Sequence, residues 1–395
     1  VSVYSQGKIA FDHAPTYGTN YVPKVSYGES DTSTVTKINP EDSVYTLNKY
    51  VSIEKADLTA DYQYCSRSWN GSSVVSSTQT ANCTTLDNTN FPTALSDGWY
   101  AVKGDVTVSD RITVSGKVHL ILTDGCTLNA KNGINLPESS TLSIYGQSGG
   151  TGKLNAEYDG GTAIGGEYGK SCGTLNVYGG TVNANSTNEA AIGGGDSIDG
   201  TSGNGGTVNV YGGTVNAVSD SGAAIGGGDS ATGTGGNGGT VNVYGGKLTA
   251  GSSNSVAIGG GSSATGPAGN GGTVNVYGGT VDANSTRDTA IGGGCSVRGT
   301  GGNGGTVNVY GGKLNAVSSR AAIGGGLDIN GTPGSVGQTF ISGGSVSVYS
   351  KDRIAFDHAP TYGTNYIPKV TYGESDTSTV TKINPEDSVY TSNKY

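Results

Sequence analysis

The chain has 395 residues, of which 71 are glycine and 10 are proline, and its formal net charge at pH 7 is -9. This acidic balance, without a cluster of Lys or Arg, argues against nucleic acids and anionic membranes as partners. No apolar run approaches the roughly 20 residues that a membrane-spanning helix needs, so we expect no membrane insertion within this sequence.

The first 50 residues return almost unchanged as residues 346–395, with six of the fifty positions different. We expect such a duplication when one full repeat, with the end of the previous one, is cut from a tandem array. The absence of methionine and a start within the strand-like phrase Val-Ser-Val-Tyr favour the same interpretation. Neighbouring copies of the unit are then the predicted partners, joined covalently or stacked end to end. The alternative is a self-contained monomer with the same cap at both ends.

Residues 1–55 are predicted to be a connector that ends a preceding repeat unit, and residues 56–98 an N-terminal cap. The connector combines prolines, charges and tyrosines with short alternating stretches, which indicates an ordered segment with a few strands. A stack of strands exposes unpaired edges at its ends and would polymerise unless they are covered, so both segments are natural caps. Cys65 and Cys83 flank a Ser/Thr/Asn-rich stretch of the cap. They are a candidate disulfide, worth about 3 kcal/mol if formed.

Residues 99–345 are predicted to be a parallel β-helix. Residues 99–135 alternate strongly between apolar and polar positions and are typical of less regular opening turns. A period of 33 residues then follows, marked by a recurrent Gly-Thr-Val-Asn-Val-Tyr-Gly-Gly phrase. A fixed period of this size indicates stacked supersecondary units that bury an apolar face together. The period is marked by Tyr145, Tyr178, Tyr211, Tyr244, Tyr277 and Tyr310.

Each repeat contains three short strand patterns. In the first, Val208 and Val210 lie on one face and Tyr211 on the other. Two further patterns, around Val215 and Ile225, follow glycine-rich corners, where a positive φ or a close backbone approach is needed. Successive near-identical turns place each strand beside its own copy in parallel, with right-handed crossovers. The predicted fold is therefore all-β: a right-handed parallel β-helix (solenoid) with 33-residue rungs, flanked by short β-rich connector segments, the second being residues 346–395.

The outward face of the repeats offers a candidate binding surface. Aromatic rings beside amide and hydroxyl groups suit a polysaccharide chain. The alternative is that such ladders stabilise the stack itself. The candidate ligand-binding residues are Tyr178, Tyr211, Tyr244, Tyr277, Tyr310, Asn209, Asn242 and Asn275.

Calcium is the one candidate cofactor. Glycine-rich β-rolls bind it through a G-G-x-G-x-D-x-U-x repeat, whose sixth residue is an aspartate. Residues 235–243 match the glycines of this repeat, but Thr240 takes the place of the carboxylate. Asp196, Asp199 and Asp229 lie in loops of adjacent rungs and are the candidate calcium ligands; the alternative is that they are solvated loop carboxylates. Three histidines and the lack of a C-x-x-C motif make a zinc site improbable.

We expect no enzymatic activity. Many parallel β-helices cleave acidic polysaccharides, which requires paired carboxylates or a base with a cluster of cations on one face. Here the acidic residues of the rungs are scattered, the loops carry few basic residues, and the repeated positions are Thr, Asn and Tyr.

Three sets of phrases resemble a known family: residues 97–102, residues 111–122, and the recurrent Ala-Ile-Gly-Gly-Gly followed by Gly-Gly-Thr-Val-Asn-Val-Tyr-Gly-Gly. They are similar to the glycine-rich parallel β-helix modules of large secreted surface proteins of anaerobic Gram-positive bacteria. The resemblance covers about residues 60–345 and extends to the connector. It implies a secreted, cell-surface protein of an adhesin-like, carbohydrate-binding group. The predicted function is one unit of a tandem array that forms a surface stalk, fibre or filament; the alternative is a polysaccharide-binding adhesin module.

Overall fold

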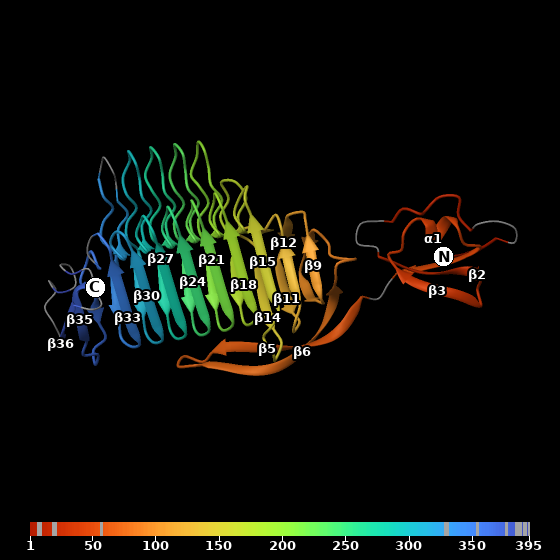
Figure 1. The fold of residues 1–395 in the computed structure, drawn as a ribbon, viewed down its shortest axis with the longest axis horizontal. Helices are drawn as coiled ribbons and strands as arrows, with labels where there is room; N and C mark the ends of the chain where they lie inside the picture. The colour runs from red at the N-terminus through yellow and green to blue at the C-terminus, as the bar shows by residue number, and fades with distance from the viewer. Residues whose placement is uncertain are drawn as a thin grey trace.

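The computed structural model describes residues 1–5, 10–17, 22–55, 58–327, 332–352, 355–375, 378–383, 389 and 393. Its main body is a parallel β-solenoid in which each turn adds one strand to each of three sheets (Figure 1). The predicted fold class is confirmed. An antiparallel sheet lies beyond the start of the solenoid, and a short hairpin lies at its other end (Figure 1).

The first sheet, here called the tyrosine sheet, is parallel except for the hairpin at one edge. Its strands are β5 (Thr59–Trp69), β6 (Val74–Leu86), β8 (Gly98–Val102), β11 (Lys117–Leu122), β14 (Thr141–Gly146), β17 (Thr174–Val177), β20 (Thr207–Val210), β23 (Thr240–Val243), β26 (Thr273–Val276), β29 (Thr306–Val309), β32 (Gln338–Ile341) and β34 (Thr361–Tyr362).

The chain then turns into the second sheet. Its strands are β9 (Asp105–Val108), β12 (Thr127–Ala130), β15 (Lys153–Tyr158), β18 (Thr181–Ser186), β21 (Thr214–Ser219), β24 (Lys247–Ser252), β27 (Thr280–Ser285), β30 (Lys313–Ser318) and β33 (Ser345–Ser350).

The third sheet completes each turn with strands of two or three residues. They are β7 (Ala94–Leu95), β10 (Ile112–Val114), β13 (Ile134–Asn135), β16 (Ile164–Gly165), β19 (Ile192–Gly193), β22 (Ile225–Gly226), β25 (Ile258–Gly259), β28 (Ile291–Gly292) and β31 (Ile323–Gly324).

The register places each residue beside its copy in the next turn. Val208 pairs with Val241, which is the predicted offset of 33 residues. The first turns are shorter, since Thr127 pairs with Lys153, and the last is one residue shorter, since Lys313 pairs with Ser345. The loops between sheets absorb these differences, so the strands stay in line. The solenoid also runs past the predicted limits of 99 and 345, because β7 and β33 belong to its sheets.

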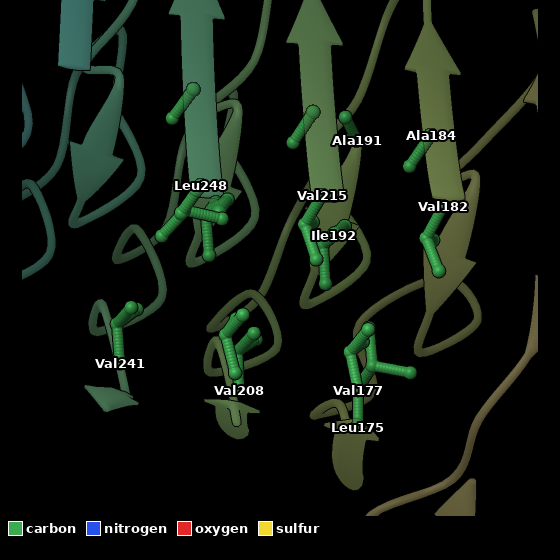
Figure 2. Packing of buried hydrophobic residues seen from close by; sticks show 14 of the residues in the cluster. Leu175, Val177, Val182, Ala184, Ala191, Ile192, Val208, Val215, Val241 and Leu248 are labelled. Carbon is green, nitrogen blue, oxygen red and sulfur yellow. The ribbon is translucent and has the colours of Figure 1, made fainter. Parts of the chain in front are cut away.

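Small aliphatic side chains fill the interior (Figure 2). Leu175 and Val177 from the tyrosine sheet, Val182 from the second sheet and Ile192 from the third have no exposed surface. They alternate with outward Thr and Asn, as the pattern of the repeat predicts. Each large side chain contributes about 1.5–3 kcal/mol of gross burial.

Two positions explain why residues other than glycine do not fit at the corners of the solenoid. Gly213, at the corner after Tyr211, has a φ of 76°, which an L side chain adopts only with strain. Gly227 lies so close to the neighbouring backbone that a Cβ would be 2.0 Å from the carbonyl oxygen of Gly236. The high glycine content is therefore a property of the tightly stacked corners.

The N-terminal segment forms an antiparallel sheet of order β1-β4-β2-β3. Its elements are β1 (Ser2–Tyr4), β2 (Pro23–Ser30), β3 (Ser33–Ile38), the four-residue helix α1 (Ser43–Thr46) and β4 (Tyr50–Lys55). Val25, Val44, Tyr45, Val51 and Ile53 form its own small core. The helix was not predicted from the sequence.

The second copy of this sequence is placed differently. Its first residues belong to β33, the last strand of the second sheet, and Ala355, Phe356 and Ala359 are buried against the last turn of the solenoid. Phe356 forms a parallel bridge with Ile323 of β31. Beyond them, β35 (Lys369–Ser375) and β36 (Ser378–Ile383) form an antiparallel hairpin. The same sequence thus closes the end of a solenoid at one terminus and precedes its beginning at the other.

Candidate functional site

The tyrosines predicted to point outward form one continuous stack. Tyr145 lies within β14 and each of the others directly follows a strand of the tyrosine sheet, so the parallel register places the rings one above another. Neighbouring centroids are 4.7 to 5.0 Å apart, and the ring planes differ by only 5° to 11°. This tyrosine ladder consists of Tyr145, Tyr178, Tyr211, Tyr244, Tyr277 and Tyr310.

The antiparallel hairpin β5–β6 runs along the solenoid and contacts the ladder (Figure 1). At the middle of β5, Tyr64 packs against Tyr145 with a centroid distance of 4.8 Å. Near its tip, Trp69 packs on both Tyr244 and Tyr277, at 5.7 and 5.6 Å. Between them, the guanidinium of Arg67 donates a hydrogen bond to the backbone carbonyl oxygen of Tyr178.

The hairpin therefore partly covers the surface that was predicted to bind sugar. Tyr178, Tyr211, Tyr244 and Tyr277 are half-buried, and burial raises the pKa of each phenol. Tyr310 is the most exposed ring of the ladder, at 43%, and its far side contacts Phe340. Because each ring lies against its neighbours, the ring faces that would stack on a sugar are occupied, and the ladder presents edges instead.

The asparagines beside the tyrosines are also engaged within the stack. The side-chain nitrogens of Asn209, Asn242 and Asn275 each donate to the side-chain oxygen of the asparagine one turn earlier, at 2.8 Å. A second amide ladder, which sequence reasoning missed, runs along the second sheet through Asn155, Asn183 and Asn216. Stacked amides of this kind stabilise parallel in-register strands.

The three candidate calcium ligands do not form one ligand set. Asp196 and Asp229 are stacked, since the backbone N–H of Asp229 donates to Oδ1 of Asp196 at 2.7 Å, whereas Asp199 is exposed. Within the described residues, no group of three or more acidic, histidine or cysteine side chains is placed to hold a metal ion. A calcium site at these three positions is therefore not supported by their geometry.

The alternative prediction of solvated carboxylates is wrong for Asp196 and Asp229. They are half-buried and lie near two further acids, Glu189 and Asp288, which precede strands of the third sheet. Desolvation raises the pKa of both Asp196 and Asp229, and nearby carboxylates raise it further. The signal was present in the sequence, because positions 189, 222, 255 and 288 are 33 residues apart and two of them are acidic.

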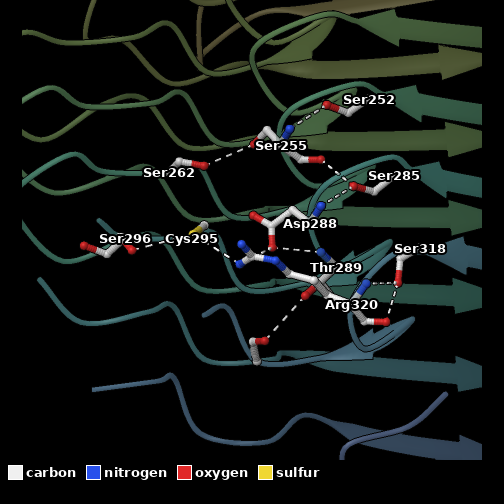
Figure 3. Close-up of polar contacts among 11 residues, drawn as sticks. Ser252, Ser255, Ser262, Ser285, Asp288, Thr289, Cys295, Ser296, Ser318 and Arg320 are labelled. Carbon is white, nitrogen blue, oxygen red and sulfur yellow. Dashed lines mark hydrogen bonds and ion pairs between the residues drawn. The ribbon is translucent and has the colours of Figure 1, made fainter. Parts of the chain in front are cut away.

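Asp288 is the most deeply buried of these acids, with 2% of its surface exposed (Figure 3). Its Oδ1 accepts a hydrogen bond from the backbone N–H of Thr289 at 2.8 Å and lies 3.8 Å from Nη1 of Arg320. Its Oδ2 has no hydrogen-bond partner in the described part of the chain. Burial raises the pKa of Asp288 to about 6, although Arg320 and the Thr289 hydrogen bond act in the opposite direction.

The predicted disulfide between Cys65 and Cys83 is wrong. Both thiols are free, although β5 and β6 pair as the two arms of one hairpin. The register places Cys65 opposite Thr78 and Cys83 opposite Ala60, so the two cysteines lie at different levels of the hairpin. Burial raises the pKa of the Cys83 thiol to about 11, which disfavours the reactive thiolate.

Comparisons with protein-family models, with curated proteins and with solved structures find no match to this chain. The resemblance to surface modules of anaerobic bacteria therefore stays a prediction. In the part of the chain that the structure describes, no helix is long and apolar enough to cross a membrane.

Proposed function

We propose that this chain is a structural repeat unit of a secreted, cell-surface array, in which β-solenoid rods are joined end to end into a stalk, fibre or filament. The observation that carries the proposal is the pair of 50-residue copies at the two ends of one solenoid. One copy is seated on the last turn through Ala355, Phe356 and Ala359, and the other leads through β4 towards β5. A segment that ends one rod and precedes the next is what a linear array needs.

The side chains along the rod support a mechanical role. The apolar core, the tyrosine ladder and the two amide ladders all run parallel to the stacking direction. Each turn contacts mainly its neighbours, so stability grows with the number of turns. We propose no catalytic role.

Electron microscopy of native full-length material from the cell surface tests this proposal. Nine stacked strands at about 4.8 Å give a rod of roughly 40 Å. We expect a regular axial repeat set by this length plus the connector. Isolated short rods would show instead that the two copies are caps of a self-contained protein.

Adhesion to polysaccharides is the second candidate, and the ladder distinguishes it from the structural role. Replacing both Tyr244 and Tyr277 by Ala is expected to lower the free energy of unfolding by roughly 1.5–4.5 kcal/mol, because the change removes three tyrosine stacks at about 0.5–1.5 kcal/mol each. Urea denaturation measures this loss, and a glycan array compares binding before and after the change. Adhesion would be favoured over the structural role if the wild type binds a glycan and the double variant loses this binding while it keeps its fold and its stability.

A further inference from the structure

A pocket of about 460 Å³ lies between two sets of connecting segments of the solenoid. One wall consists of residues that lead from the second sheet to the third, and the other consists of residues that follow the third-sheet strands. Three successive turns contribute to the first wall, because Asn254, Arg287 and Arg320 precede β25, β28 and β31. Pockets that hold small molecules have volumes of about 300–1,000 Å³. The size of this pocket therefore fits a small ligand.

The two walls differ in their chemistry. The exposed residues Asn254 and Arg287 of the first wall are polar. The exposed residues Ala264 and Val297 of the second wall are apolar. A ligand in the pocket would therefore contact a polar surface on one side and an apolar surface on the other.

The charged residues of the pocket include both signs. Each wall contributes a carboxylate, since Asp288 belongs to the first and Asp229 to the second. The formal charges of these two acids are balanced by those of Arg287 and Arg320. A purely cationic ligand would meet two guanidinium groups, and a purely anionic ligand would meet two carboxylates. The best match is a ligand that carries both a positive and a negative charge.

Two of these charged groups have atoms without a partner in the described part of the chain. Oδ1 of Asp288 lies 3.8 Å from Nη1 of Arg320, but Oδ2 is buried and accepts no hydrogen bond, although such atoms are normally paired. The carboxylate points from the first wall towards Cys295 of the second (Figure 3). The guanidinium of Arg287 forms no hydrogen bond or ion pair with a described residue. The pocket thus presents an unused acceptor and an unused set of donors.

The lining residues also depart from the repeat. Asp229, Ser262 and Cys295 are spaced by 33 residues, so they occupy equivalent places but cannot form a ladder of identical side chains. Burial raises the pKa of Asp229 and of Asp288, which means that their ionised forms lower the stability of the folded protein. Perturbed acids of this kind in a pocket are typical of functional sites. Stabilisation of the stack therefore does not explain these residues.

We propose that this pocket binds a small zwitterion, a molecule that carries one ammonium group and one carboxylate. The ammonium donates to Oδ2 of Asp288, and Asp229 adds its negative charge from the opposite wall. The carboxylate accepts from Arg287, because a guanidinium presents several N–H donors in a geometry that matches a carboxylate. The carbon chain between the two charges lies against Ala264 and Val297. All of these residues belong to one solenoid, so the binding does not depend on the proposed array.

Isothermal titration calorimetry of the intact chain with glycine, 3-aminopropanoate, 4-aminobutanoate and 6-aminohexanoate tests the proposal. The series varies the separation between the two charges. We expect saturable binding of at least one member. We expect the matched amine and the matched carboxylate of the same chain length to bind at least about tenfold more weakly, because each lacks one charge-assisted hydrogen bond. No binding of any member to the folded chain, or equal binding of the matched amine, would overturn the proposal.

Two variants locate the two ends of the ligand. Asp288→Asn is expected to weaken binding of the amino acid at least about tenfold, because it removes the charge that pairs with the ammonium. This change removes a buried charge, so the loss is not expected to come from unfolding. Arg287→Ala is expected to weaken binding of the amino acid about tenfold and to leave binding of the matched amine unchanged.

The controls are Asp199→Asn and Arg298→Ala, which change the same charges at exposed positions outside the lining. We expect both controls to keep the affinity of the wild type. Circular dichroism checks that all four variants remain folded. Unchanged affinity in either Asp288→Asn or Arg287→Ala would contradict the assignment of the two ends.

Discussion

Replacing Val243 by Asp is expected to disrupt the central turns of the solenoid. Val243 is fully buried in β23 and lies in register with Val210 and Val276 of the adjacent turns. The change removes about 1.5–3 kcal/mol of apolar burial and places a carboxylate in a core without a partner, which adds several kcal/mol. Because stability in a solenoid is propagated between neighbouring turns, we expect a lower urea midpoint and new protease cleavage near β23.

Val218→Asp is the matched control for this prediction. Val218 lies in the same solenoid, on β21, but 44% of its surface is exposed. We expect its effect on the free energy of unfolding to stay within about 0.5 kcal/mol, as for most surface changes. Equal tolerance of both substitutions would contradict the assignment of inward and outward positions.

The second large effect is on pH dependence. Asp288→Asn is expected to stabilise the protein at pH 8 and to change its stability little below pH 4. Burial raises the pKa of Asp288 from 3.8 to about 6 in the folded protein. Between these two values the unfolded chain releases the proton and the folded chain keeps it, so folding loses stability as the pH rises.

The size of this effect follows from the shift. A shift of about two pKa units, at about 1.4 kcal/mol each, corresponds to a destabilisation of the folded protein by roughly 3 kcal/mol. This destabilisation is fully present above pH 6 and disappears as the pH falls towards 4. Asp196 and Asp229, whose pKa values are also raised, contribute in the same direction. Urea denaturation of wild type and variant between pH 4 and pH 8 measures the difference.

Asp220→Asn controls for the change in net charge. Asp220 lies in the same series of loops, but its side chain is exposed. Because this side chain is exposed, we expect the change to alter the free energy of unfolding at pH 8 by no more than about 0.5 kcal/mol. If Asp288→Asn does not stabilise the protein at pH 8 more than Asp220→Asn does, the burial of Asp288 does not control the pH dependence.

The solenoid was predictable because its signals are local and repeated. Alternation in residues such as Val208 and Val210 assigns the inward face, and the period of 33 residues brings equivalent strands into register. The same period correctly predicts that the tyrosines and asparagines form ladders. It does not reveal whether another segment covers them.

The tertiary structure alone decided which surfaces are covered. Arg67 contacts Tyr178 across 111 residues of sequence, and no periodic pattern links the hairpin to the ladder. Likewise, Cys65 and Cys83 are free because the register of β5 and β6 places them at different levels of the hairpin. The spacing of the two cysteines in the sequence does not define this register.

The two near-identical copies show most directly what the sequence determines and what depends on the tertiary structure. The sequence by itself determined that they are equivalent segments able to form the same strands, since side-chain alternation is a local property. Only the tertiary structure decided that Phe356 is buried on the last solenoid turn while Phe11 packs edge-on against Tyr45. The physical reason is that burial and strand pairing depend on which partner surface lies nearby, and identical sequences at the two ends of a rod meet different surfaces.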